Sequence, residues 1–212
     1  MRLLALAAFL AALTPLFGQQ PKPQDTELWE PVPKVVTPGA GNAAPPSDAI
    51  MLFDGRNIEE WVTAQDKLPA GRVVAGGALT VNRAPGVGII ETRRTFRNYQ
   101  FHLEWKIPEG IAGDEQARGN SGVFLASTGT GDAGYELQIP PVNPNRKTGE
   151  WQTCDVAWST PAFNPDGSLK GETLNIGQPF YREYYSAPIK LHAHGDRSEP
   201  IGFRNMWVGE LN

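Results

Sequence analysis

Apolar and polar residues alternate most clearly over residues 99–107. The odd-numbered positions of this segment carry Tyr, Phe, Leu, Trp and Ile, whereas the even-numbered positions carry Gln, His, Glu and Lys. A period of two places the two sets on opposite faces of a β-strand. The segment therefore predicts a strand with one face in a hydrophobic core and the other in water. His102 lies on the polar face, and we interpret it as an ordinary surface residue.

Short runs of the same kind follow one another from residue 50 onwards, separated by Gly, Pro, Asn and Asp. Besides the first segment, they predict strands at residues 50–53, 72–74, 78–81, 88–92, 121–126, 135–139, 150–158, 188–193 and 201–211. No window shows a helical period of useful length. Many short strands separated by turn residues are typical of a β-sandwich or jelly roll. We therefore predict an all-β domain.

The first residues have the organisation of a signal peptide. Arg2 precedes an apolar run of Leu, Ala and Phe at residues 3–13, and Thr14, Pro15 and Gly18 follow it. This order matches a positive start, an apolar centre and a cleavage zone. The run is shorter than the roughly 20 residues that cross a bilayer, so we predict no transmembrane segment. We expect residues 1–18 to be removed and the mature protein to be secreted or periplasmic.

Composition defines the rest of the chain. Residues 19–48 are rich in Pro, Gly and Ala, which predicts an extended arm or linker ahead of a folded domain at residues 49–212. The formal net charge is −4, and a mildly acidic chain without a basic patch is a poor binder of nucleic acids. Cys154 is the single cysteine, so an exported domain must be stabilised by its core rather than by an intramolecular disulfide.

Several segments of the predicted domain carry a pattern that is more specific than strand propensity. They are Leu-Phe-Asp-Gly-Arg-Asn at 52–57, Gly-Asn-Ser-Gly-Val-Phe-Leu at 119–125, Gly-Tyr-Glu-Leu-Gln-Ile at 134–139, Pro-Ile-Lys-Leu at 188–191 and Phe-Arg-Asn-Met-Trp-Val at 203–208. In this order and spacing they resemble the 3-keto-disaccharide hydrolase domain family of bacterial exported proteins, over residues 50–211. The resemblance implies a concanavalin-like sandwich of two antiparallel sheets. It also implies cleavage of the glycosidic bond of 3-keto-glycosides.

A 3-keto group changes how a glycoside can be cleaved. The carbonyl acidifies the proton on C2, because the carbanion left by its removal is an enolate. The leaving group can then depart from C1, and water adds back. Such a reaction needs a base for C2, a stabiliser for the enolate oxygen and an acid for the leaving oxygen. A divalent metal is one form that the stabiliser can take.

The candidate catalytic residues are Glu136 and His194. Glu136 shares a strand face with Gln138, where the pair could bind sugar hydroxyls or accept the C2 proton; the alternative is a solvated outer face. His192 and His194 also share a face, roughly 6.5–7 Å apart along the strand. That spacing allows both imidazoles to bind one metal, or one of them to act as a base. His192 and His194 are therefore also candidate ligands of a divalent metal, Ca²⁺ or another ion.

The candidate substrate-binding residues are Arg118, Asn120, Gln138 and Trp151. Arg118 and Asn120 flank a glycine ahead of a strand, where an Arg could hold a keto oxygen with paired donors; the alternative is an exposed loop. Trp151 could stack on a sugar ring, and it lies on the opposite face of its strand from Trp158. We expect Arg204 to form a structural ion pair; Asp155 could be its partner or, alternatively, an acid of the site.

The chain also departs from the family pattern. Ala193 occupies a position where the family carries an acidic residue, and Ile139 is followed directly by Pro140 and Pro141 instead of an Asp and a Gly-rich stretch. We therefore expect a member of the family that is shortened and has lost acidic residues. The leading hypothesis is an exported enzyme that cleaves 3-keto-glycosides. The alternatives are a carbohydrate-binding module without catalysis and an interaction domain of the cell envelope.

Overall fold

The computed structural model describes residues 22, 30, 32, 34–41, 43–71, 73–81, 88–111, 121–131, 133–139, 146–170, 183–193 and 201–211. All regular elements among these residues are β-strands. No helix in the described part of the chain is long and apolar enough to cross a membrane. One compact unit spans Val36–Asn212, and it contains both sheets.

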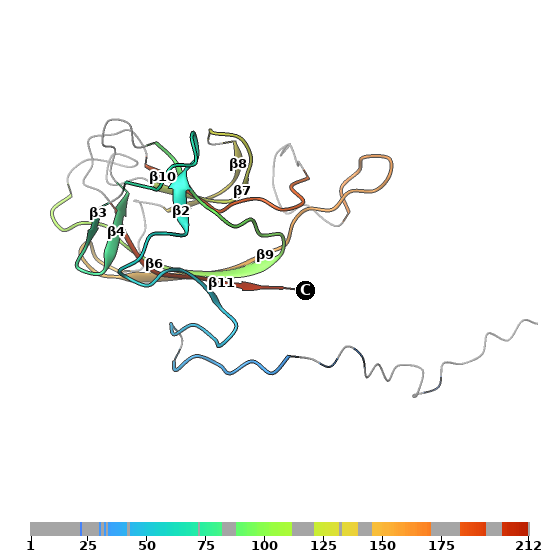
Figure 1. Ribbon diagram of the computed structural model, residues 1–212, viewed down its shortest axis with the longest axis horizontal. Helices are drawn as coiled ribbons and strands as arrows, with labels where there is room; N and C mark the ends of the chain where they lie inside the picture. Colours follow the sequence, from blue (N-terminus) through green and yellow to red (C-terminus); the bar gives the residue numbers. More distant parts are fainter. Residues whose placement is uncertain are drawn as a thin grey trace, which may run out of the picture. The chain divides into compact units, whose positions relative to one another are not determined.

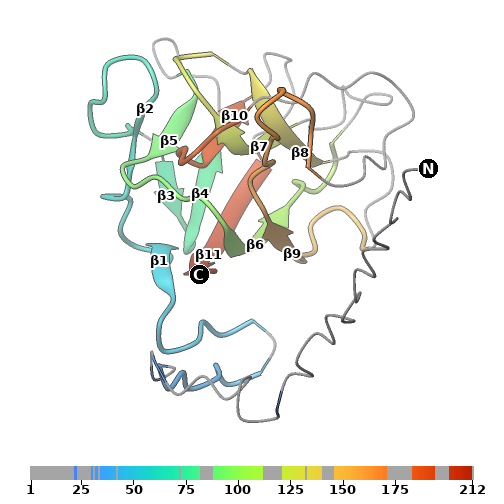
Figure 2. The same ribbon diagram turned by 90° about the vertical axis from the view of Figure 1, so that its right-hand side faces the viewer.

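The strands form two antiparallel layers, as the sequence predicted for a β-sandwich (Figure 1). The six-stranded sheet has the order β3 (Val73–Ala75), β4 (Ala78–Val81), β11 (Ile201–Glu210), β6 (Tyr99–Lys106) and β9 (Gln152–Trp158), with β1 (Ile50–Phe53) also paired to β11. The five-stranded sheet has the order β2 (Trp61–Thr63), β5 (Ile90–Thr92), β10 (Lys190–Ala193), β7 (Ser121–Ser127) and β8 (Gly134–Ile139). Figure 2 shows the five strands of the second sheet in this order.

The core lies between the two sheets and consists of the inward-facing apolar residues of both. The apolar positions of β6 all contribute to it, as their alternation predicted. Tyr99 links the layers, because its hydroxyl donates a hydrogen bond to the carbonyl oxygen of Leu125 in β7 at 2.5 Å. Burial raises the pKa of Tyr99 well above its usual range, so the hydroxyl stays protonated. Trp61 is fully buried, and its Nε1 donates to the carbonyl oxygen of Leu52 at 2.9 Å.

The strand predictions are confirmed with small shifts at the ends. The strand expected at residues 72–74 begins one residue later, at Val73, and the strand expected at 88–92 is limited to Ile90–Thr92. The sequence did not predict β2, which has three residues and pairs with β5. Such a short strand contains too few positions for an alternation to be recognised.

The prediction that the polar face of β6 is wet is wrong for His102 and Glu104. His102 is fully buried, its Nδ1 lies 2.6 Å from Oδ1 of Asp155, and its ring stacks on Trp207 with 4.9 Å between centroids. The chain ahead of β1 contributes to this covering, since the carbonyl oxygen of Ala43 accepts hydrogen bonds from Nδ2 of Asn205 and Nε1 of Trp207. The outer face of this sheet is therefore partly covered by chain and ring contacts.

Arg204 forms the structural ion pair that the sequence led us to expect, with Glu104 rather than Asp155 as its partner. Its Nε donates to Oε2 of Glu104 at 2.6 Å, whereas Asp155 contacts His102. Asn205 also donates to Glu104, from a left-handed backbone conformation (φ 46°) at an irregularity in the pairing of β11 with β6. Burial opposes ionisation of Glu104, but these two hydrogen bonds and the nearby positive charge of Arg204 together outweigh it and hold the pKa of the carboxyl below its usual range.

Candidate functional site

Polar residues gather on the outer face of the five-stranded sheet, the face directed away from the core. One row of directly paired residues crosses this face through Gln138 in β8, Gly122 in β7 and His192 in β10. Directly paired residues of antiparallel strands have side chains on the same face. Gln138 and His192 therefore project from the outer face, on either side of the glycine. We call this set the Gly122 row.

A second row lies two residues further along the strands. It consists of Glu136 in β8, Phe124 in β7, Lys190 in β10 and Glu91 in β5. We call this set the Lys190 row. Alternate residues of a strand are roughly 6.5–7 Å apart, so the two rows are neighbours on one surface. Sequence alternation had placed Glu136 and Gln138 on the face of β8 away from the core, and both are exposed in the structure.

Gly122 leaves the space in which the carboxylate of Glu136 lies. A Cβ atom at residue 122 would overlap Oε1 and the carboxyl carbon of Glu136. The carboxylate is thus directed over β7, the strand that separates Gln138 from His192. The ring of His192 is half-buried and lies 6.1 Å from the ring of Phe124. The carboxylate of Glu136, the amide of Gln138 and the imidazole of His192 therefore lie on the same small area of the sheet, around Gly122.

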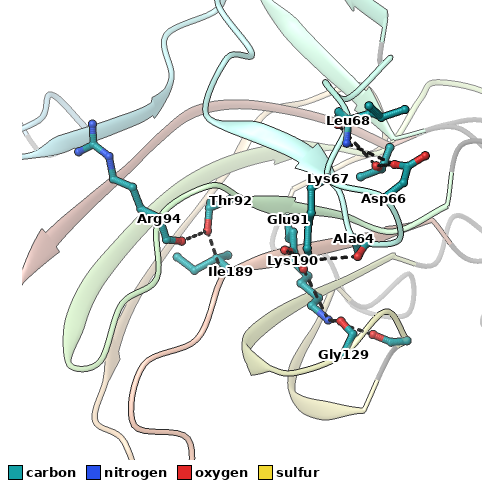
Figure 3. A network of polar contacts seen from close by, with 12 residues as sticks. Ala64, Asp66, Lys67, Leu68, Glu91, Thr92, Arg94, Gly129, Ile189 and Lys190 are labelled. Atoms are coloured by element: carbon teal, nitrogen blue, oxygen red, sulfur yellow. Dashed lines mark hydrogen bonds and ion pairs between the residues drawn. The ribbon is translucent and has the colours of Figure 1, made fainter.

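Lys190 and Glu91 form a charged network under the adjacent loops (Figure 3). Lys190 is fully buried, and its Nζ donates to the carbonyl oxygens of Gly129 at 2.7 Å and Gly131 at 3.2 Å. Glu91 is 5% exposed, and its Oε1 accepts a hydrogen bond from Nζ of Lys67 at 2.5 Å. Oε2 of Glu91 lies 3.9 Å from Nζ of Lys190. Buried charges are costly unless they are compensated, and these pairings provide part of that compensation.

The structure does not bring all of the predicted site residues together. Trp151 lies over the outer face of the six-stranded sheet, with the guanidinium of Arg204 4.0 Å and Nζ of Lys106 5.0 Å from its ring centroid. It is therefore on a different sheet from Glu136, and its ring is occupied by two cations. Trp158 faces inward, next to Tyr135, so the prediction that the two tryptophans lie on opposite faces holds. Arg118, Asn120 and His194 lie outside the described residues.

The predicted metal site depends on residues that are only partly described. His192 supplies one imidazole on the outer face, and its predicted companion His194 is outside the described residues. Within the described ranges, no three His, Cys, Asp or Glu residues are placed so that they could bind one ion. The described residues thus do not make up a ligand set.

Sequence reasoning did not single out Gly122, Lys190 or Glu91 as parts of this face. These residues lie within predicted strands, which was the one indication that they could share this face. Lys190 is two residues before His192, and Glu91 is in the strand expected at residues 88–92. Which residues lie opposite one another depends on the register between strands that are distant in the sequence, and alternation within one strand does not determine it.

Comparison with known proteins agrees with this fold. A crystal structure from Parabacteroides distasonis ATCC 8503, described as a "putative glycosyl hydrolase", is 34% identical and has a TM-score of 0.72; the match covers 90% of this chain and 97% of that one. Another structure from the same organism with the same description is 19% identical, with a TM-score of 0.52 over 78% of this chain and 94% of that one, and supports the fold alone. None of the curated proteins matches the chain.

The family itself is shown by a match that covers most of the domain. The model of the 3-keto-alpha-glucoside-1,2-lyase-like domain matches residues 48–209, a range that contains all the strands but the final residue of β11. This match confirms the resemblance identified from the sequence motifs, and it supports a carbohydrate-related role. The chain therefore belongs to the 3-keto-alpha-glucoside-1,2-lyase-like domain family.

Proposed function

We propose that the protein is an exported enzyme that cleaves the glycosidic bond of 3-keto-glycosides on the outer face of its five-stranded sheet. The observation that carries the proposal is the exposed carboxylate of Glu136, which lies over Gly122 between Gln138 and His192. Membership of the family supplies the substrate class. The signal-peptide pattern of residues 1–18 supports the proposal of export to a secreted or periplasmic location.

In the proposed reaction, ionised Glu136 removes the C2 proton of the substrate, and the electron pair of that C–H bond moves into an enolate on the C3 oxygen. The enolate then expels the leaving group from C1, and this group takes a proton from an acid. Water adds to C1 of the resulting enone and gives its proton to the deprotonated acid, while the proton held by Glu136 returns to C2. The products are a 3-keto sugar and an alcohol. Base and acid assistance of this kind each contribute about 10²–10⁴-fold to a rate.

The other residues of the site have supporting roles in this proposal. The amide of Gln138 is adjacent to Glu136 on β8 and binds sugar hydroxyls. His194 is the proposed acid, and Arg118 and Asn120 are proposed to bind the sugar. Trp151 is left out of the site, because it lies on the other sheet. The enolate oxygen needs a stabiliser, and a metal held by His192 and His194 is one candidate for that role, to be tested by chelation.

The test is an assay of the purified chain with a 3-keto-glucoside that carries a chromogenic leaving group, with and without EDTA. We expect release of the leaving group, and no release from the corresponding unoxidised glucoside, whose C2 proton has no neighbouring carbonyl. Loss of activity in EDTA would establish a metal requirement. If a protein that is shown to be folded releases no leaving group, the proposed enzymatic activity is wrong.

A carbohydrate-binding module without catalysis is the second candidate. Ala193 favours it, because this position lacks the acidic residue found in the family pattern. This candidate predicts saturable binding of the 3-keto-glucoside without formation of product. The same assay, combined with a binding measurement, therefore separates the two candidates.

Replacing Gly122 with Ala is expected to lower the rate of leaving-group release by about tenfold or more. The new Cβ would overlap the carboxylate of Glu136 and force it to another position. Gly202→Ala is the matched control, since a Cβ there would be in ordinary contact with Trp151 at 3.6 Å and with Ala78 at 3.7 Å, on the other sheet. The role given to Gly122 is wrong if both variants, equally well folded, retain the wild-type rate.

A further inference from the structure

A hollow lies beside the charged network, next to β2 and β5 of the five-stranded sheet. It has a volume of about 430 Å³ and lies between the segment that follows β2, the end of β5 with the residues after it, and the turn that follows β7. Cavities of about 300–1,000 Å³ are typical of small-molecule sites. The mechanism proposed above does not use this cavity.

Glu91 lines this cavity and has one carboxylate oxygen that is not satisfied. Oε1 is paired with Lys67, but Oε2 is buried and has no hydrogen-bond partner in the structure. Its separation of 3.9 Å from Nζ of Lys190 is too long for a hydrogen bond. A buried acceptor without a partner costs about 1–3 kcal/mol, and more when it is charged. A ligand that donates a hydrogen bond at this place would remove that cost.

The surroundings of Glu91 define the kind of ligand. The ammonium groups of Lys67 and Lys190 already face its carboxylate, so a metal ion or another cation would be repelled. The wall also contains the side chains of Gln65, Thr128 and Thr130, which both donate and accept hydrogen bonds. A neutral sugar has hydroxyl groups that also do both, and it fits these walls better than an apolar or a charged molecule.

The cavity is placed so that it could serve the same ligand as Glu136. Glu91 and Glu136 belong to the Lys190 row and project from the same face, with β10 and β7 between their strands. Three strand spacings correspond to about 14 Å. A single sugar ring does not cover this distance, but an oligosaccharide can.

We propose that this cavity is a second carbohydrate subsite, which binds a further sugar unit of an oligosaccharide whose 3-keto unit lies at Glu136. The inference rests on the proposed function, and it narrows the substrate from any 3-keto-glycoside to an oligosaccharide of at least three units. Glu91 binds a hydroxyl of the distant unit through Oε2, and the exposed threonine and glutamine side chains of the wall complete the contacts.

The experiment is calorimetric titration of the full chain with glucose, cellotriose, maltotriose and laminaritriose. We expect at least one trisaccharide to bind at least about tenfold more tightly than glucose. Glu91→Gln and Thr130→Leu should each remove most of this advantage. Thr153→Leu is the matched control, because Thr153 is an exposed threonine of β9 in the other sheet. Glu91 is buried, so its replacement can disturb folding. Thr130→Leu is a second cavity variant that should fold normally, since Thr130 is exposed in a turn.

The outcomes separate this inference from the proposed function. If all three trisaccharides bind as weakly as glucose, or if the advantage persists in both cavity variants, the subsite is overturned. Release from the short chromogenic 3-keto-glucoside should be the same in Thr130→Leu and in the wild type, because this substrate does not reach the cavity. Absence of that release in the wild type would reject the proposed reaction, while a trisaccharide advantage that is lost in both variants would still support the subsite.

Discussion

Glu136→Gln is expected to lower the turnover of a chromogenic 3-keto-glucoside by at least about 10²-fold. Gln has nearly the same shape as Glu, but its amide cannot accept the C2 proton. The side chain of Glu136 is exposed on the outer face, so the substitution removes no core packing. We therefore expect an unchanged melting temperature and a KM close to that of the wild type, with the loss in kcat. Steady-state kinetics with thermal unfolding of both proteins provides the measurement.

Glu150→Gln is the matched control for this substitution. Glu150 is also exposed, but it precedes β9, a strand of the other sheet. Its replacement makes the same change of charge and should leave kcat within about twofold of the wild type, because it is remote from the reacting atoms. A Glu136→Gln protein with a wild-type kcat would remove Glu136 from the mechanism and would favour another base on the same face.

The sequence predicted the two-layer fold because the alternation that identifies the core-facing side of a strand lies within that strand. In β6 and β8, alternation alone identified the residues that face the core, and the structure has the same residues there. Trp61 shows the opposite situation. It is fully buried in a strand of three residues, and its burial and its hydrogen bond to Leu52 arise from contacts between different strands. No period within the segment could have shown this.

What covers the outer face of a sheet is also not encoded in the strand itself. The pattern of β6 correctly placed His102 on the face away from the core, but the residue is buried by Trp207 and by the chain around Ala43. The same reason explains Trp151. Its face relative to Trp158 was predictable from their spacing, whereas the sheet to which β9 belongs was not. Glu136 and Gln138 could be placed together because they are neighbours on one strand.

Lys190→Met is expected to lower the free energy of unfolding by about 3–5 kcal/mol. Met has nearly the length of Lys, so the loss reflects charge and hydrogen bonding rather than an empty space. The substitution would leave the carbonyl oxygens of Gly129 and Gly131 without the donor that they now share. It would also leave Glu91, which is 5% exposed, with Lys67 as its remaining cation. Denaturant unfolding monitored by tryptophan fluorescence measures the change.

Two further proteins test whether the charge network is the cause of this loss. Lys147→Met changes an exposed lysine and should alter the free energy of unfolding by no more than about 0.5 kcal/mol. Combining Lys190→Met with Glu91→Leu should be less destabilising than the sum of the two single substitutions, because the double variant no longer buries an uncompensated carboxylate. If Lys190→Met costs less than about 1 kcal/mol, the network does not stabilise the sheet. The outer face around Glu136 would then depend on its strands alone for its geometry.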